Sequence, residues 1–376
     1  MRRFLFASLA LVVVFSTASA QRSVVPAIAA DLPGNAAVSM PLRWSEGVMQ
    51  SRIGSWLLPA NFIGQTIRGI RLRRPAFVGE PAYPALTRTL TVRASFQTLR
   101  PNQLSIDLNV NRTATAPAVV FGPAPFSVAA TTTHGRGGLL GAEYVVIPFS
   151  PPLLVTAGHL FLEFEVTNAP LTVSAGHWCD AVWVRNGNEV GYAVAVGDGG
   201  CSTRSTPLTL AWTDPLLGPR RGSNTTLAMA GGMPATTGSV PVLWWIGFDP
   251  QARATGPTWP GFGADFGAIV PPMAGCHLWV PPDAVLSGQT SIVGTYSFGF
   301  ALPPAATTVG QKIGVQCSTL DPGRAVLPLS LTNGEILVLD SIGVADKCAT
   351  VFFPGTVTVS PWPTQVGLMP VVVIEH

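Results

Sequence analysis

The sequence predicts an all-β protein of two β-sandwich, jelly-roll-like domains with little helix. Several segments alternate apolar and polar residues with a period of two, which is typical of half-buried strands. Thirty-nine glycines and 35 prolines supply turns between these segments. A sheet with one apolar face must bury that face against another layer, which favours sandwiches. The chain of 376 residues is longer than one hydrophobic core usually serves, so we expect two domains.

The N-terminus has the pattern of a secretory signal peptide over residues 1–20. Arg2 and Arg3 precede an apolar run that ends at Phe15, and small residues lead to a cleavage site after Ala20. This run is too short to span a bilayer, which takes about 20 residues. No later stretch is long and apolar enough either. We therefore expect a secreted or cell-envelope protein (periplasm, cell surface or extracellular) without a transmembrane segment after signal cleavage.

Composition excludes two classes of partner. Only 11% of residues are charged, and the formal net charge is +3, of which Arg2 and Arg3 lie in the predicted signal peptide. A chain so weakly charged lacks the basic surface that binds nucleic acid or anionic lipid. The hydrophobic content of 47% also argues against disorder.

The predicted strands differ in how they are buried. Four segments alternate with period two: 90–97, 160–166, 292–298 and 312–317. The run Val242–Ile246 is apolar throughout, which is typical of a strand buried on both faces. Asn333-Gly334 predicts a hairpin turn, and residues 48–59 could carry a short helix.

The predicted domain boundary lies near a glycine-rich segment. Gly197, Gly199 and Gly200 precede Cys201, and the cysteines begin just before this segment. We therefore expect an N-terminal β-sandwich domain over residues 21–195 and a C-terminal one over residues 196–376.

Short motifs occur in both halves of the chain. The first half contains an Ile-x-Gly-Ile-x-Leu-Arg strand and a Trp-Cys-Asp-Ala element. The second half contains a Gly-Gly-Cys element, a Gly-Cys-x-Leu-x-Val strand and a Gly-x-x-Ile-x-x-Gln element. They lie at Ile67–Arg73, Trp178–Ala181, Gly199–Cys201, Gly275–Asp283 and Gly310–Gln316, with Pro215–Gly218, Leu302-Pro303 and Thr332–Gly334 as lesser marks. In this order they resemble a two-module exported β-sandwich protein family of unknown function from planctomycete-type bacteria. The resemblance implies a two-part exported protein and carries no catalytic residue over.

The resemblance also implies one disulfide. The shared cysteines of the second module match Cys201 and Cys276, and a bond between them closes a loop of about 75 residues, worth roughly 4 kcal/mol in the chain-entropy model. The alternative is two separate buried thiols. Cys317–Cys348 is a possible second disulfide, which leaves Cys179 over from the five cysteines. No two cysteines have the C-x2-C spacing of a structural zinc site.

The densest polar group is His177-Trp178-Cys179-Asp180. In a strand, His177 and Cys179 share a face and could form a two-ligand metal site. We favour the alternative, a strand end with a packed tryptophan and a buried or bridged cysteine. We predict no metal site and no cofactor.

Glu163 and Glu165 lie on one face of a predicted strand, about 7 Å apart by strand rise. That separation suits the paired acids of a glycoside hydrolase. A solvated strand face has the same pattern, and we favour that interpretation. The motifs of zinc proteases, α/β-hydrolases and P-loop proteins do not occur.

Tryptophans supply the remaining candidate contacts. Trp259 and Trp362 lie in proline-rich segments, where exposed rings could stack on sugars. Three hypotheses follow. The leading one is a non-enzymatic exported surface, envelope or matrix protein that binds an envelope protein or a glycan. The others are a carbohydrate-binding protein and a secreted hydrolase with acidic residues.

Overall fold

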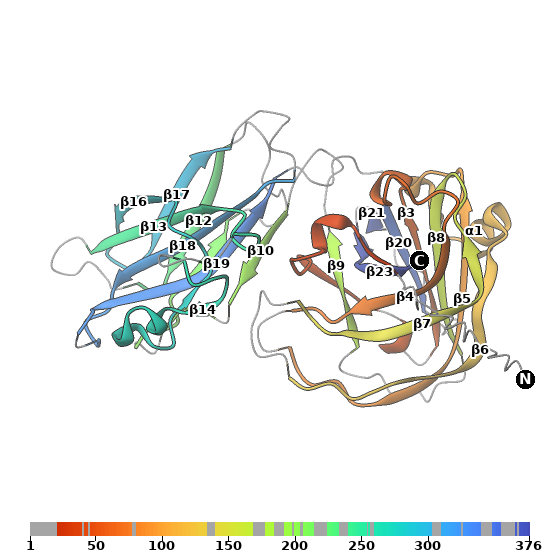
Figure 1. Cartoon of the computed structure of the whole chain (residues 1–376), viewed down its shortest axis with the longest axis horizontal. Coiled ribbons are helices and arrows are strands. Elements are labelled where there is room, and N and C mark those ends of the chain that lie inside the picture. The colour runs from red at the N-terminus through yellow and green to blue at the C-terminus, as the bar shows by residue number, and fades with distance from the viewer. Residues whose placement is uncertain are drawn as a thin grey trace, which may run out of the picture.

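The chain forms two β-sandwiches (Figure 1) in a computed structural model. The prediction of an all-β fold with little helix is confirmed. The predicted signal peptide lies outside the described residues. The structure describes residues 21–376 apart from 40, 44–45, 77–79, 134–139, 168–176, 184–191, 198, 204–205, 214–223, 233–239, 254, 256–258, 303–309, 325, 340–347, 355–364 and 367.

The first sandwich has three antiparallel sheets within the described residues. Their strand orders are β1-β23-β4-β7, β2-β9-β22 and β21-β20-β3-β8-β5-β6. A shared apolar core, with residues such as Ile70, Cys179 and Phe164, lies between the six-stranded sheet and the other two. The strands are β1 (Arg22–Val25), β2 (Ala36–Ser39), β3 (Gly47–Ile53), β4 (Thr66–Arg73), β5 (Leu86–Gln97), β6 (Ala118–Val128), β7 (Glu143–Leu154), β8 (His159–Thr167), β9 (Trp178–Trp183), β20 (Cys348–Pro354), β21 (Gln365–Val366), β22 (Leu368–Pro370) and β23 (Val372–Glu375).

The second sandwich packs a sheet of order β10-β19-β18-β13-β16 against a sheet of order β11-β12-β17. Its core includes Leu227 of the smaller sheet and Trp244 and Val315 of the larger one. A small pair, β14-β15, accompanies them. The strands are β10 (Tyr192–Val196), β11 (Thr209–Trp212), β12 (Asn224–Ala230), β13 (Pro241–Phe248), β14 (Ala264–Asp265), β15 (His277–Leu278), β16 (Ala284–Gln289), β17 (Tyr296–Ala301), β18 (Lys312–Leu320) and β19 (Leu329–Val338).

Helices are short in the part of the chain that the structure describes. The α-helix α1 (Leu108–Thr115) is capped by Asp107, whose carboxylate accepts a hydrogen bond from the Asn109 backbone N–H at 2.8 Å. The 3-10 helices are η1 (Ala27–Ala29), η2 (Pro41–Arg43), η3 (Ser55–Leu57), η4 (Pro101–Gln103), η5 (Phe266–Ala268) and η6 (Pro271–Met273).

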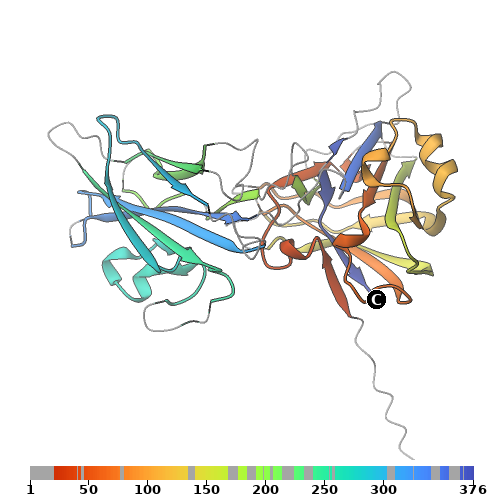
Figure 2. The ribbon, with the colours of Figure 1, turned by 90° about the horizontal axis from the view of Figure 1, so that it is seen from above.

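The C-terminal strands return to the first sandwich. Strand β20 pairs with β3, and β23 lies between β1 and β4. Figures 1 and 2 show these blue C-terminal strands within the same sandwich as the red N-terminal ones. The second sandwich is therefore inserted into the first. The strands do not follow the predicted boundaries 21–195 and 196–376, because β20, β21, β22 and β23 belong with the N-terminal sheets and β10 already belongs to the second sandwich.

Two local predictions are also wrong. Asn333-Gly334 does not form a turn: both residues lie inside β19, where the Asn333 side chain bonds to both backbone groups of Leu210. The segment 48–59 is strand β3 followed by the single turn η3. In both places tertiary packing overrides the local pattern.

An apolar cluster joins the two sandwiches. Leu32, Val182 and Val371 of the first sandwich pack with residues of the second, among them Trp279 and Ile336. At the same seam, the ammonium of Lys312 contacts the carboxylate of Asp31. The junction is therefore packed as well as covalent.

Candidate functional site

One member of the predicted acidic pair, Glu163, is buried under a helix. Glu163 of β8 pairs in register with Gln50 of β3 and Arg93 of β5, and its side chain is 0% exposed. Arg112 of α1 reaches down from above and donates to its carboxylate from Nε and Nη2. The predicted solvated position is wrong for Glu163, because α1 lies on this side of the sheet. Glu165 lies two residues further along the strand, on the same face, and is partly exposed.

The contacts of Glu163 and Glu165 form a neutral four-charge network. Arg93 Nη1 lies 2.6 Å from Glu163 and 2.5 Å from Glu165, and Arg112 contacts both carboxylates. Burial raises the pKa of Glu163, but hydrogen bonds from Arg112, Gln50 and Arg93 outweigh burial and hold that pKa below its usual value. A glycosidase needs one acid with a raised pKa. The arrangement fits a network that fastens α1 to the sheet.

His177 precedes strand β9 with a left-handed φ of 66°, so it does not share a strand face with Cys179 as predicted, although both residues contact Tyr144. His177 Nε2 lies 3.0 Å from the Pro84 carbonyl oxygen, so Nε2–H is the donor. Burial lowers the pKa of His177 to about 4 and raises that of the Cys179 thiol to about 12. A buried neutral thiol is a poor metal ligand. Among the described residues, no three His, Cys, Asp or Glu side chains gather as metal ligands.

Cys201 and Cys276 form the predicted disulfide, with their Cα atoms 5.0 Å apart. Cys276 is buried in a cluster with Met273 and Leu278, so the bond fastens the segment 259–278 to the second sandwich. The possible second disulfide is wrong. Cys317 lies in the core of the second sandwich and Cys348 in that of the first, and no bond joins them.

The candidate sugar-stacking residues are not confirmed. Trp259 is 3% exposed, because its loop folds inward over the disulfide and buries the ring against Met273 and Leu278. Trp362 lies outside the described residues. Trp56 is the one tryptophan among the exposed large apolar side chains of the described chain, and it packs edge-on against His159. A planar pair of exposed rings is therefore not seen in the described part of the chain.

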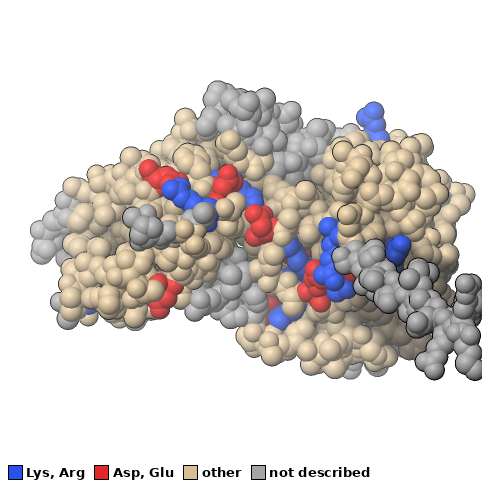
Figure 3. Space-filling model, in the orientation of Figure 1, with Lys and Arg blue, Asp and Glu red and all other residues tan. Residues whose placement is uncertain are grey.

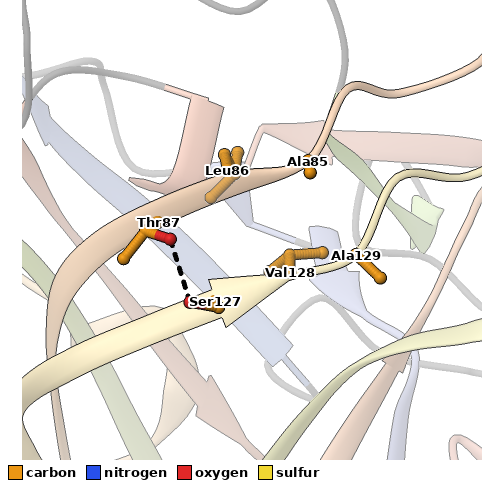
Figure 4. Close-up of a pocket in the computed structure, with 6 residues that line it drawn as sticks. All are labelled: Ala85, Leu86, Thr87, Ser127, Val128 and Ala129. Carbon is orange, nitrogen blue, oxygen red and sulfur yellow. Dashed lines mark hydrogen bonds between the residues drawn. The ribbon is translucent and has the colours of Figure 1, made fainter.

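A hollow of about 480 Å³ lies between the start of β5 and the end of β6. Thr87 Oγ1 and Ser127 Oγ are 2.9 Å apart on its wall (Figure 4). Its other lining residues are Ala85, Leu86, Val128 and Ala129. None of the candidate residues from the sequence lines this hollow, and its walls hold no ionisable side chain.

The free edge of the larger sheet in the second sandwich is the most unusual surface. Strand β16 pairs only with β13 among the described strands, and Val285 and Leu286 are 50% and 43% exposed on its two faces. Ile292 and Val293 continue the apolar surface beyond one end, and Phe248 lies at the other end. This surface was not predicted from the sequence, although the uncharged stretch Ala284–Gln289 is typical of a strand that can pair along its edge.

Strand β16 lacks the usual protection of a sheet edge. Natural edge strands carry charges, proline or bulges that prevent pairing with another chain. Residues 284–289 contain neither a charge nor a proline. Most of the surface seen in Figure 3 carries no charged side chain, so little of it repels an approaching protein.

Comparison of the chain with protein families and with curated proteins finds no match. The resemblance to the two-module exported family therefore stays a prediction. In the described part of the chain, no helix has both the length and the apolar character of a membrane span.

Proposed function

We propose that the protein is a non-enzymatic exported component of the envelope or extracellular matrix that associates through the edge of β16. The observation that carries this proposal is the exposure of an uncharged, apolar edge strand on both of its faces. Backbone N–H and C=O groups along such an edge add another extended strand. The occupant is a second copy of the same chain.

The sequence of β16 favours pairing with itself. In an antiparallel pair about a two-fold axis, Leu286 of one copy lies opposite Ser287 of the other, and Val285 lies opposite Gly288. Each large side chain then faces a small one, and no like charges meet. The two five-stranded sheets become one continuous sheet, and the apolar flanks at Ile292 and Val293 are covered.

Export is supported by two independent features. The predicted signal peptide directs the chain out of the cytoplasm. The Cys201–Cys276 disulfide suits an oxidising compartment. A protein that works in the envelope or matrix also benefits from self-association, because repeated contacts raise its avidity for a shared layer.

The test is the oligomeric state of the mature protein, measured by light scattering over a range of concentrations. We expect a dimer for the wild type and at least tenfold weaker association for Leu286→Lys, because the lysine places a charge at the two-fold axis. Val326→Lys is the matched control: Val326 is 78% exposed outside the strands, so this variant should dimerise normally. A monomeric wild type, or a Leu286→Lys variant that dimerises like the control, contradicts the proposed association.

Cell fractionation tests the export part separately. The protein should appear in the envelope or the medium with residues 1–20 removed. Recovery of the full-length chain from the cytoplasm contradicts export, whatever the oligomeric state.

A further inference from the structure

Arg52 is a completely buried cation on the outer face of the six-stranded sheet. Its side chain is 0% exposed. Nη1 donates to the carbonyl oxygen of Arg100 at 2.8 Å, while Nε and Nη2 have no hydrogen-bond partner among the described residues. Buried donors are nearly always satisfied in folded proteins, so these two N–H groups call for an acceptor.

The neighbouring charges do not neutralise Arg52. The closest ionic network along the same face joins Glu163 and Glu165 to Arg93 and Arg112, which balances two negative charges against two positive ones. Burial lowers the pKa of Arg52 to about 10, so the guanidinium keeps its charge at neutral pH. An unpaired buried charge costs several kcal/mol. The fold therefore places one surplus positive charge beneath its surface.

Two further polar side chains on this face also lack partners. Arg52, Phe161 and Ser95 lie in one row across β3, β8 and β5, so their side chains share one face of the sheet. Gln97 follows two residues after Ser95 and points to the same side. The hydroxyl of Ser95 and both amide atoms of Gln97 are buried without partners in the described part of the chain.

The segment after β5 closes this face of the sheet. Arg52 bonds to the carbonyl of Arg100, three residues beyond Gln97, which brings the guanidinium to the end of β5. Just after η4, Leu104 packs against Phe161 and Val351. The unpartnered donor and acceptor atoms of Arg52, Ser95 and Gln97 thus lie under a covered part of the sheet rather than at its open edge.

We propose that the Arg52 guanidinium, held at the end of β5 by the Arg100 carbonyl, and the Gln97 amide form a binding site for a small oxyanion that carries an O–H group, such as an α-hydroxycarboxylate or hydrogenphosphate. Arg52 Nε and Nη2 and Gln97 Nε2 are donors, which suit anionic oxygens. Gln97 Oε1 is an acceptor and requires a donor from the ligand. Water satisfies hydrogen bonds but leaves the charge of Arg52 uncompensated, so the anion is the better occupant.

Thermal unfolding of the mature protein at constant ionic strength tests the site. Glycolate, acetate and phosphate are each titrated against a chloride background. Glycolate and phosphate should raise the unfolding midpoint of the wild type in a saturable way, by about 2 °C or more at tenfold excess over the dissociation constant. Acetate should bind less tightly, because it has no O–H group for Gln97. Titration calorimetry should give one site per chain.

Variants separate this site from general salt effects. Arg52→Met should fold, because an apolar side chain suits this buried position, and should bind glycolate at least tenfold less tightly. Gln97→Leu should lose the preference for glycolate over acetate. Arg68→Met removes an exposed arginine of β4 and should respond like the wild type. The proposal is overturned if glycolate raises the unfolding midpoint of Arg52→Met as much as that of the wild type. It is also overturned if no anion gives a saturable rise in the wild type, in which case water occupies the unpartnered donors and acceptors.

Discussion

Asp180 Oδ2 lies 2.7 Å from Nη2 of Arg73, and both side chains are buried. The pair joins strand β9 to strand β4, which belong to different sheets of the first sandwich. Arg73 also donates to the carbonyls of Ala29 and Leu32, and Asp180 accepts from the backbone N–H of Gly34. One ion pair thus holds the N-terminal segment against the seam with the second sandwich.

The Asp180→Asn variant should lose about 3–5 kcal/mol of unfolding free energy, because it leaves the Arg73 guanidinium buried without a counter-charge. The Arg73→Met variant should also have a lower unfolding free energy than the wild type. The double variant should lose less unfolding free energy than the two single variants lose together, because it contains no buried charge without a counter-charge. Urea unfolding of all four proteins measures this coupling, and strictly additive losses contradict a shared ion pair.

The alternating pattern correctly predicted which side of several strands faces the core. Leu160, Leu162 and Phe164 of β8 are buried between the sheets of the first sandwich, as their spacing indicates. The same pattern failed for Glu163. Its burial depends on α1, a segment some fifty residues earlier in the chain, and on Arg112 within it. The sequence of the strand contains no sign that a distant helix covers its polar face.

The predicted domain boundaries and the predicted exposure of Trp259 were wrong for a similar reason, because both depend on contacts between residues far apart in the sequence. The pairing of β20, β22 and β23 with β3, β9 and β4 has no local signature, because the sequence of a short strand does not indicate its partner. Trp259 shows the same limit. A proline-rich context predicts an exposed loop, yet the disulfide at Cys276 draws that loop onto the sandwich and buries the ring.

The fragment 21–195, the predicted N-terminal domain, should not fold alone. It lacks β20, which pairs with β3, and β23, which lies between β1 and β4, so apolar core and backbone groups of the first sandwich are exposed. Near-UV circular dichroism and limited proteolysis should show an unfolded chain. Co-expression with residues 348–376 should restore protection, whereas cooperative unfolding of the fragment alone contradicts the discontinuous fold.

Glu335 should make the unfolding free energy depend on pH. It lies inside the second sandwich, opposite Ala195 of β10 and Val315 of β18, and its Oε2 has no partner among the described residues. Burial raises the pKa of this carboxyl to about 8, from a usual value of 4.5. The folded protein therefore binds a proton that the unfolded chain releases between these two values.

The sign of the effect follows from that proton. Because the folded state binds more protons between pH 4.5 and 8, the unfolding free energy falls as pH rises through this window, by up to about 1.4 kcal/mol per pH unit. Glu335→Gln should remove this slope between pH 6.5 and 8 while keeping an unpartnered amide in the same place, so the slope rather than the absolute stability is diagnostic. Urea unfolding at several pH values measures it. Glu46→Gln, at an exposed position, should keep the wild-type slope. If the wild type and Glu335→Gln have parallel pH profiles, Glu335 is ionised in the folded protein and a cation must reach it.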